Sequence, residues 1–133
     1  MELQIHVPIN ADVDIVDARQ KGRALATTIG FSAGDSTLIA TAISELARNI
    51  VIYARRGEVI LKAIERHGRN GIVVVAKDDG PGIVNIEQAL RDGFSTSGSL
   101  GLGLPGVRRL MDDFDIISEA GRGTAVTITK WKR

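Results

Sequence analysis

Two consecutive runs of β-branched residues in the middle of the chain constrain its fold most strongly. Residues 59–64 and 72–76 have the composition of strands, and Asn70-Gly71 is a strong signal for a hairpin turn between them. The second run is apolar at successive positions, so both of its faces should be covered, as in a central strand. We therefore expect a sheet built around this hairpin.

Strand and helix patterns precede the hairpin. Apolar and polar residues alternate over 3–9, as in a half-buried strand, and helical spacing of apolar residues then continues up to Gly30. Ser32, with an aspartate three residues later, resembles a capping box and predicts a second helix that ends before Gly57.

Similar patterns follow the hairpin. A short helix is predicted over 85–91, a second helix begins near Pro105, and 115–118 with 124–131 form a closing hairpin. Hairpins in place of regular crossovers predict a two-layer α/β sandwich, with a mixed, mostly antiparallel sheet covered by helices on one face. At 133 residues, we expect one domain over 1–133.

The composition is that of an ordinary globular protein. Hydrophobic residues make up 44%, charged residues 25%, and the net charge of +1 gives no indication of nucleic acid. The absence of cysteine excludes disulfides, thiolate zinc sites and a cysteine nucleophile. Neither a signal peptide nor an apolar run of membrane-spanning length is recognised, so we expect a cytoplasmic protein with no membrane partner.

Glycine is concentrated in one part of the chain. Seven of the fifteen glycines fall between Gly80 and Gly106, and residues 93–100 show no packing periodicity. Glycine lets the backbone approach a ligand closely, because no Cβ intervenes. We expect the functional site here, with 93–100 as a loop.

Glu45 and Asn49 form the most informative polar pair. They lie one helical turn apart, at the edge of an apolar stripe, and should face a cleft. Magnesium prefers oxygen ligands and keeps several waters, so the Asn49 carboxamide and phosphate oxygens suffice to hold it. Glu45 is then placed to accept a proton from an attacking hydroxyl or water. The simpler alternative is an ion pair of Glu45 with Arg48 on a solvated helix face.

Asp78 and the glycines after it are candidates for binding a base. A carboxylate at the end of an apolar strand needs hydrogen-bond donors, and the exocyclic amine of adenine is a suitable one. Gly80 and Gly82 let the chain turn beneath the base, although Gly80-Pro81-Gly82 alone is typical of a tight turn.

Gly101 and Gly103 are candidates for binding phosphate. They precede the helix near Pro105, whose free N–H groups and positive dipole end would face the phosphates. Gly101-x-Gly103-x-x-Gly106 also matches the dinucleotide-binding pattern, but it follows a loop and not a strand, so we reject that interpretation.

Four motifs together resemble the N, G1, G2 and G3 boxes of the GHKL ATPase and kinase superfamily, which has the Bergerat fold. They are Glu45-x-x-x-Asn49, Asp78-x-Gly80-x-Gly82, Gly98-x-x-Gly101-x-Gly103 and Gly123-Thr124. Within that superfamily, residues 44–49 (SELARN), 92–98 (DGFSTSG) and 101–112 (GLGLPGVRRLMD) are similar to the RsbT-type serine/threonine kinases of the bacterial stressosome. This similarity extends over nearly the whole chain.

The resemblance implies ATP and Mg²⁺ as cofactors, and assigns roles to the motif residues. Glu45 would be the general base, Asn49 the magnesium ligand, and Asp78 the adenine contact, supported by Thr124. The loop 93–100 would be the ATP lid. Further nucleotide contacts are implied at Gly80, Gly82, Gly98, Gly101, Leu102 and Gly103.

The resemblance also implies a function in partner switching. Such a kinase phosphorylates a Ser or Thr of STAS-domain proteins of the RsbS and RsbR type, and is then released to activate an RsbU-like phosphatase or another output protein. The short lid does not support the ATP-driven dimer clamping of chaperone and topoisomerase relatives.

Two other functions are possible from the sequence. One is a nucleotide-dependent anti-sigma-type or switch binding module with little phosphoryl transfer, against which the presence of Glu45 argues. The other is an orphan catalytic domain of a histidine kinase. Neither His6, in a strand, nor His67, near a turn, has the setting of a phosphoacceptor, so a complete histidine kinase is not expected.

Overall fold

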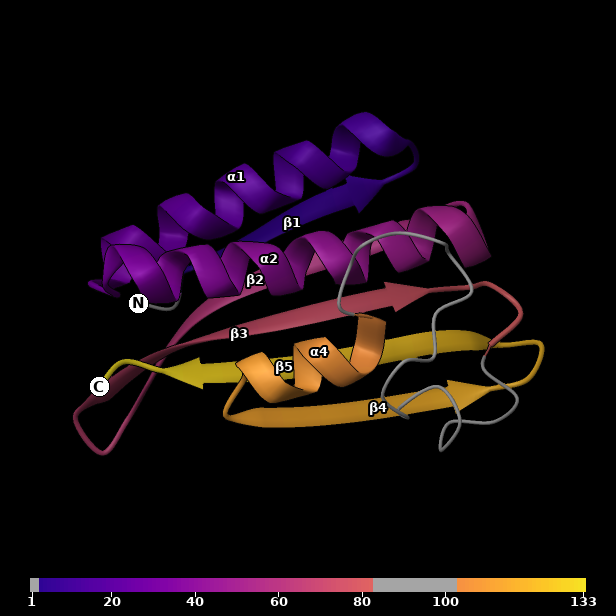
Figure 1. Cartoon of the computed structure of the whole chain (residues 1–133). Helices are drawn as coiled ribbons and strands as arrows, with labels where there is room; N and C mark the ends of the chain where they lie inside the picture. Colours follow the sequence, from indigo (N-terminus) through magenta and orange to yellow (C-terminus); the bar gives the residue numbers. More distant parts are fainter. Residues whose placement is uncertain (1–2, 83–102) are drawn as a thin grey trace.

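The computed structural model describes residues 3–82 and 103–133, which form one sheet covered by helices (Figure 1). The strand order is β1-β2-β3-β5-β4, and all four pairings are antiparallel. This confirms the mostly antiparallel sheet, with the apolar run 72–76 in its central strand. The strands are β1 (Gln4–Ile9), β2 (Gly57–Arg66), β3 (Arg69–Asp78), β4 (Asp113–Glu119) and β5 (Gly123–Trp131).

The helices lie on one face of the sheet, so the predicted two-layer α/β sandwich is confirmed (Figure 1). The predicted helix over 85–91, the loop 93–100, and Gly98, Gly101 and Leu102 lie outside the described residues. The helical elements are α1 (Asp12–Ile29), α2 (Ala33–Asn49), the π-helix η1 (Ile50–Ala54) and α4 (Gly103–Leu110).

The end of α1 and the start of α2 follow from local side-chain chemistry. Gly30 takes the left-handed conformation, with φ of 109°, and its N–H is donated to the carbonyls of Ala26 and Thr27. Ser32 then caps α2, because its Oγ accepts the N–H of Asp35 at 3.1 Å. Both boundaries agree with the predictions.

The core lies between the sheet and the helices. Each fully buried Leu, Ile or Val side chain contributes about 1.5–3 kcal/mol to stability. The largest fully buried side chains come from both layers: Ile9, Ile39, Ile43, Leu46, Leu61, Ile72 and Ile128, with Val7, Val59, Val74 and Val107.

One helical stretch, Ala33–Ala54, is long and apolar enough to cross a membrane by length and composition. No such run was expected from the sequence. However, half of its most apolar window is buried inside the protein, and Ile39, Ile43 and Leu46 lie in the core. The core helix of a globular domain has the same composition, so this stretch does not by itself indicate a membrane segment.

The predicted turn at Asn70-Gly71 is wrong. The β2–β3 turn is at His67-Gly68, with φ of 54° and 76°, and positive φ at both central positions matches the twist of a two-residue hairpin. Gly71 lies within β3, where a Cβ would come within 2.7 Å of the Trp131 ring. This glycine is therefore needed for packing against the ring and not for the turn.

Two aromatic residues follow the ends of α2 and α4. Tyr53 is 45% exposed in η1. Phe114 lies in β4 because α4 ends at Leu110.

The buried Lys130 donates from Nζ to the Leu110 carbonyl at 3.0 Å, so a cation stabilises the C-terminal end of α4.

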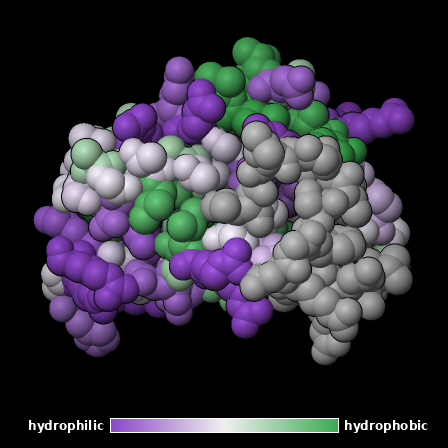
Figure 2. Space-filling view, in the orientation of Figure 1, coloured by the Kyte–Doolittle hydropathy of each residue, from purple (hydrophilic) through white to green (hydrophobic). Residues whose placement is uncertain are grey.

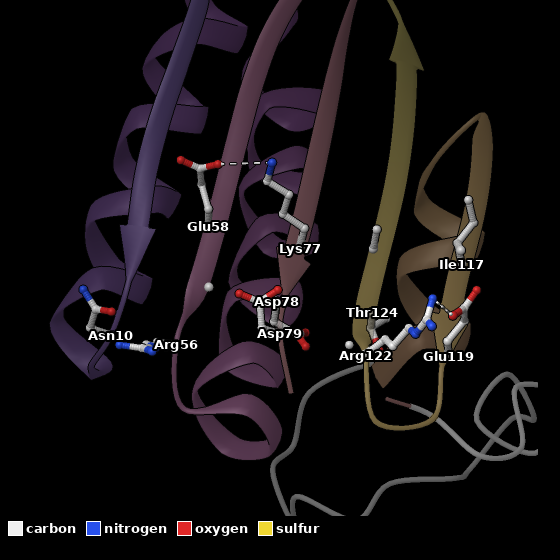
Figure 3. A pocket seen from close by; sticks show the side chains of 13 residues that line it. Asn10, Arg56, Glu58, Lys77, Asp78, Asp79, Ile117, Glu119, Arg122 and Thr124 are labelled. Atoms are coloured by element: carbon white, nitrogen blue, oxygen red, sulfur yellow. Dashed lines mark ion pairs between the residues drawn. The ribbon is translucent and has the colours of Figure 1, made fainter. Parts of the chain in front are cut away.

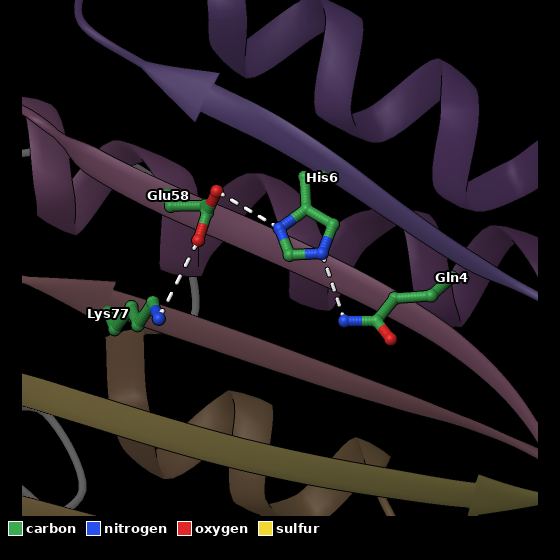
Figure 4. Close-up of polar contacts among 4 residues, drawn as sticks. All are labelled: Gln4, His6, Glu58 and Lys77. Carbon is green, nitrogen blue, oxygen red and sulfur yellow. Dashed lines mark hydrogen bonds and ion pairs between the residues drawn. The ribbon is translucent and has the colours of Figure 1, made fainter.

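A polar network crosses three strands on the sheet face away from the helices (Figure 4). His6 Nδ1 lies 3.1 Å from one oxygen of Glu58, and Lys77 Nζ lies 3.7 Å from the other. Gln4 Nε2 lies 2.9 Å from His6 Nε2. His6 is therefore in a strand, as predicted, and links β1 to β2.

Asp112 connects the end of α4 to the end of β5. Its Oδ2 accepts the Trp131 N–H at 2.7 Å, and its Oδ1 accepts from the Arg133 guanidinium. Burial alone would raise the pKa of Asp112. The hydrogen bonds from Trp131 and Arg133, together with the charges of Arg133 and Lys130, outweigh burial and hold this pKa below its usual value.

We expect Asp112→Asn to lower the free energy of unfolding by about 1–3 kcal/mol at neutral pH, as for hydrogen bonds to a charged group. Because the folded-state pKa is depressed below 3.8, this stability is present above that value and is lost as the pH falls through the folded pKa. Urea unfolding at several pH values measures the difference between wild type and variant. Asp113→Asn, at an exposed neighbour, is the control, and a difference that grows on acidification would contradict the assignment.

Candidate functional site

The predicted site residues that the structure describes lie at one end of the molecule. Here α2 and β3 end and β5 begins, toward the right of Figure 1, and α4 begins between this end and the middle of the view. Among the described residues, the fold therefore brings three of the motifs, together with Gly103 of the fourth, to the same end of the sandwich.

Glu45 is buried, only 6% exposed, and contacts the start of α4. Its Oε2 accepts the backbone N–H of Gly103 at 3.3 Å, and its Oε1 accepts from the Arg48 guanidinium at 3.1 Å. Since Gly103 is the first residue of α4, the carboxylate meets the positive end of a helix. The alternative ion pair with Arg48 thus exists, with its carboxylate buried and the Arg48 side chain 36% exposed.

Asn49 is the last residue of α2 and is partly buried. Directly after it the chain changes to the π geometry of η1, which is frequent at functional sites. Ala54, at the end of η1, packs so closely on Gly80 that a Cβ there would lie 2.5 Å from the Ala54 Cβ. Through η1, the chain therefore connects the Asn49 end of α2 to the glycines that follow β3.

Asp78 ends β3, directly opposite Gly57 on β2 and Thr124 on β5. It is partly buried, and its Oδ1 accepts the N–H of Gly80 at 2.8 Å. A carboxylate has about four lone-pair sites, so this contact leaves capacity for another donor. The Thr124 hydroxyl lies 2.8 Å from the Ser118 hydroxyl on β4. This contact holds the Thr124 side chain next to β3, the strand that ends in Asp78.

Three glycines around Asp78 are required by the protein's own backbone. An added Cβ would lie 2.4 Å from a β3 carbonyl oxygen at Gly57, 2.0 Å from the Asp78 carbonyl at Gly123, and 2.3 Å from a β4 carbonyl at Gly82. Gly82 and Gly123 also have positive φ, of 79° and 106°. The sequence suggested only that Gly82 makes room for a base, and the structure adds a packing reason.

Sequence reasoning missed several neighbours of these residues. Gly57 was treated only as the end of a helix, Ala54 was not considered, and Ser118 was assigned only to a strand. Their contacts run between strands and across a helix end, so no short-range spacing in the sequence indicates them.

A groove of about 630 Å³ lies at the same end of the sheet (Figure 3). Its lining includes Asp78 and Thr124 but neither Glu45 nor Asn49. Much of the rest belongs to the sheet face away from the helices, including two ion pairs, Glu58–Lys77 at 3.7 Å and Glu119–Arg122 at 3.4 Å. This groove therefore does not connect the pair Glu45 and Asn49 with the pair Asp78 and Thr124.

The side-chain oxygens at this end of the molecule suit a magnesium ion whose other ligands are phosphate oxygens and waters. No cluster of three or more His, Cys, Asp or Glu suited to a metal occurs within 3–82 and 103–133. Asn49 offers one carboxamide oxygen, and magnesium needs few protein ligands when phosphates and waters supply the others. The partly buried Asp78 has the acceptor capacity that an amino group of a base requires.

Comparison with known proteins relates this geometry to a family. Residues 9–130 match the family model for the histidine kinase-like ATPase domain. The chain is 50% identical over 133 residues to the serine/threonine-protein kinase RsbT of Bacillus subtilis (strain 168), covering 100% of each. It is 31% identical over 97 residues to the anti-sigma F factor of Thermoanaerobacter sp. (strain X514), covering 70% of this chain and 68% of that relative.

A solved structure shares the fold. The mycobacterial sensor histidine kinase MprB matches with a TM-score of 0.58 at 20% identity, covering 97% of this chain and 99% of that chain. The enzyme class expected from the sequence, a protein serine/threonine kinase, is confirmed by the full-length match to RsbT. The chain belongs to the histidine kinase-like ATPase domain family and, within it, to the RsbT-type serine/threonine-protein kinases.

Proposed function

We propose that this chain transfers the terminal phosphoryl group of Mg²⁺-bound ATP to a Ser or Thr hydroxyl of a STAS-domain partner of the RsbS or RsbR type. The observation that carries the proposal is Glu45, a buried carboxylate at the start of α4, one turn from Asn49. The full-length similarity to RsbT supports the reaction class, and the similarity to anti-sigma F factors supports a regulatory, partner-exchanging role.

ATP, when bound, supplies the phosphoryl group, and Mg²⁺ neutralises charge on its phosphates. In this chain, Asp78 accepts the amino group of adenine with the capacity left by its Gly80 contact, and Thr124 on the neighbouring strand supports that contact. Asn49 holds the ion. The remaining nucleotide contacts are proposed along the glycine motifs, at Gly80, Gly82, Gly98, Gly101, Leu102 and Gly103.

Glu45 takes the proton of the attacking hydroxyl. As the Ser or Thr oxygen bonds to the terminal phosphorus and ADP leaves, the carboxylate accepts the hydroxyl proton. The Gly103 contact, at 3.3 Å, is longer than the usual ~2.9 Å for an N–H···O bond and is therefore easily replaced by a substrate hydroxyl. Arg48, held by the other oxygen, keeps the side chain in its buried rotamer.

The same reaction provides a switch. We propose that the unphosphorylated STAS partner holds the kinase, and that phosphorylation releases it to activate an RsbU-like phosphatase or another output protein. Both steps would take place in the cytoplasm.

The test is intact-mass measurement of a cognate STAS protein incubated with the chain and Mg-ATP. The partner should gain one phosphate that survives acid, because phosphoserine and phosphothreonine are acid-stable whereas phosphohistidine is not. Phosphate lost in acid would favour the orphan histidine-kinase domain. If nucleotide binds but the mass of every cognate STAS protein is unchanged, the nucleotide-dependent binding module is the better description.

Asn49→Asp should change the Mg²⁺ dependence of ATP binding by about tenfold or more, in line with changes around other metal sites. The reason is that a carboxylate replaces the neutral carboxamide beside phosphates and ion. Calorimetric titration with ATP, in Mg²⁺ and in EDTA, measures it. Asn70→Asp, exposed at the far end of β3, is the control. Unaltered Mg-ATP affinity and turnover would exclude a metal role for Asn49.

A further inference from the structure

Two arginines lie opposite one another beside the β2–β3 turn. Arg66 and Arg69 are register partners on either side of His67-Gly68, and both are exposed. Their guanidinium carbons lie 5.8 Å and 5.6 Å from the centroid of the Trp131 ring, within cation–π range. One indole ring therefore contacts two like charges.

The position of this ring is set by the sheet. Its six-membered part lies against β3 at Gly71, where a Cβ would come within 2.7 Å of Cε3 and 3.0 Å of Cζ3. The Trp131 backbone N–H is donated to Asp112 at 2.7 Å, and the Lys132 N–H to the Asn70 carbonyl at 2.8 Å. The ring is thus a preformed platform beside the two guanidinium groups.

In the part of the chain that the structure describes, no carboxylate neutralises the two guanidinium groups. Like charges directly opposite on a sheet are destabilising. Within the described ranges no carboxylate oxygen lies within 4.0 Å of Arg66 or Arg69, whereas the nearby Arg133 pairs with Asp112. Hydrophilic side chains gather at the lower left of Figure 2, where Figure 1 places the β2–β3 turn. An external anion would relieve the repulsion.

The surroundings limit the size of that anion. Asp113 and Asp115 on β4 share the sheet face of Trp131, Arg66 and Arg69. A long polyanion such as nucleic acid would meet these carboxylates as well as the arginines. A short acidic protein segment fits better, because the planar guanidinium binds carboxylate through two parallel hydrogen bonds. Trp and Arg also dominate the energetics of protein interfaces.

We propose that Arg66, Arg69 and Trp131 form a docking site for neighbouring carboxylates in an acidic segment of a partner protein. The site lies at the opposite end of β3 from Asp78, about 30 Å away at the rise of a strand. A partner held here therefore leaves the nucleotide end accessible. The inference is independent of which hydroxyl accepts the phosphoryl group.

The test uses the single tryptophan of the chain, whose fluorescence reports on this site alone. Hexaglutamate, titrated into the full chain at low ionic strength, should change Trp131 emission saturably, and added NaCl should weaken the binding. Arg66→Gln/Arg69→Gln should weaken it at least about tenfold. Arg19→Gln/Lys21→Gln, which removes the same charge from exposed positions of α1, should change it less than about twofold.

Several results would overturn the proposal. They are the absence of a saturable response, equal binding by the Arg66→Gln/Arg69→Gln protein, and an equal loss in the Arg19→Gln/Lys21→Gln control. Inorganic phosphate or a short DNA duplex that binds more tightly than hexaglutamate would identify a different ligand and also overturn it. Thermal unfolding shows that the variants are folded, and removal of the arginine repulsion should not lower Tm.

Discussion

Glu45→Gln should reduce phosphoryl transfer to the partner by about 10²–10⁴-fold, the usual contribution of a general base, while ATP binding is retained. The amide cannot accept the hydroxyl proton. Its oxygen still accepts the Gly103 N–H, so the start of α4 keeps its contact with α2. Single-turnover transfer from labelled ATP, together with calorimetric ATP titration, separates chemistry from binding.

Glu58→Gln is the matched control for this experiment. Glu58 is also a carboxylate with a cationic neighbour, but it lies on the sheet face away from the helices. Its removal should leave transfer within about twofold of wild type. Transfer by Glu45→Gln at the wild-type rate would show that the proton goes elsewhere, and loss of ATP binding in that variant would instead assign Glu45 to binding.

Asp78→Asn should weaken ATP binding at least about a hundredfold, equivalent to roughly 2.7 kcal/mol, and phosphoryl transfer should fall with it. Asp78 Oδ1 already accepts the Gly80 N–H. In the variant that acceptor position is kept by the amide oxygen, so the amide nitrogen faces the amino group of adenine. Two donors then meet in a partly buried site, where an unmade hydrogen bond is costly.

Asp79→Asn is the control, since it removes a neighbouring, exposed carboxylate. Titration with ATP and GTP measures both affinity and base selectivity. The wild type should prefer ATP strongly, and Asp78→Asn should lose most of that preference because guanine presents an acceptor where adenine presents a donor. Wild-type ATP affinity in the variant would exclude an adenine contact at Asp78.

These two variants separate the two halves of the site. We expect the Glu45→Gln protein to bind ATP without transferring the phosphoryl group, and the Asp78→Asn protein to lose both ATP binding and phosphoryl transfer. If the chain were only a nucleotide-dependent binding module, there would be no phosphoryl transfer to lose. The Glu45 substitution would then change only the binding of the partner protein.

Most elements could be predicted from sequence because their signals are local. The Ser32 cap, the Gly30 stop and the central strand over 72–76 each depend on spacings within one element. The prediction of a turn at Asn70-Gly71 was wrong because a local sequence signal competed with the packing requirement of a distant contact. Gly71 is required beneath the Trp131 ring, 60 positions later, and His67-Gly68 takes the turn instead.

Within the described residues, the sequence by itself determined the order of strands and helices, the helical pairing of Glu45 with Asn49, and the position of Asp78 at a strand end. These depend on periods of two and 3.6 residues, which any short window contains. Only the tertiary structure decided that Glu45 meets Gly103, 58 residues away, and that Thr124 lies opposite Asp78. Such contacts depend on strand register and on close backbone approaches, which arise only when the whole chain packs.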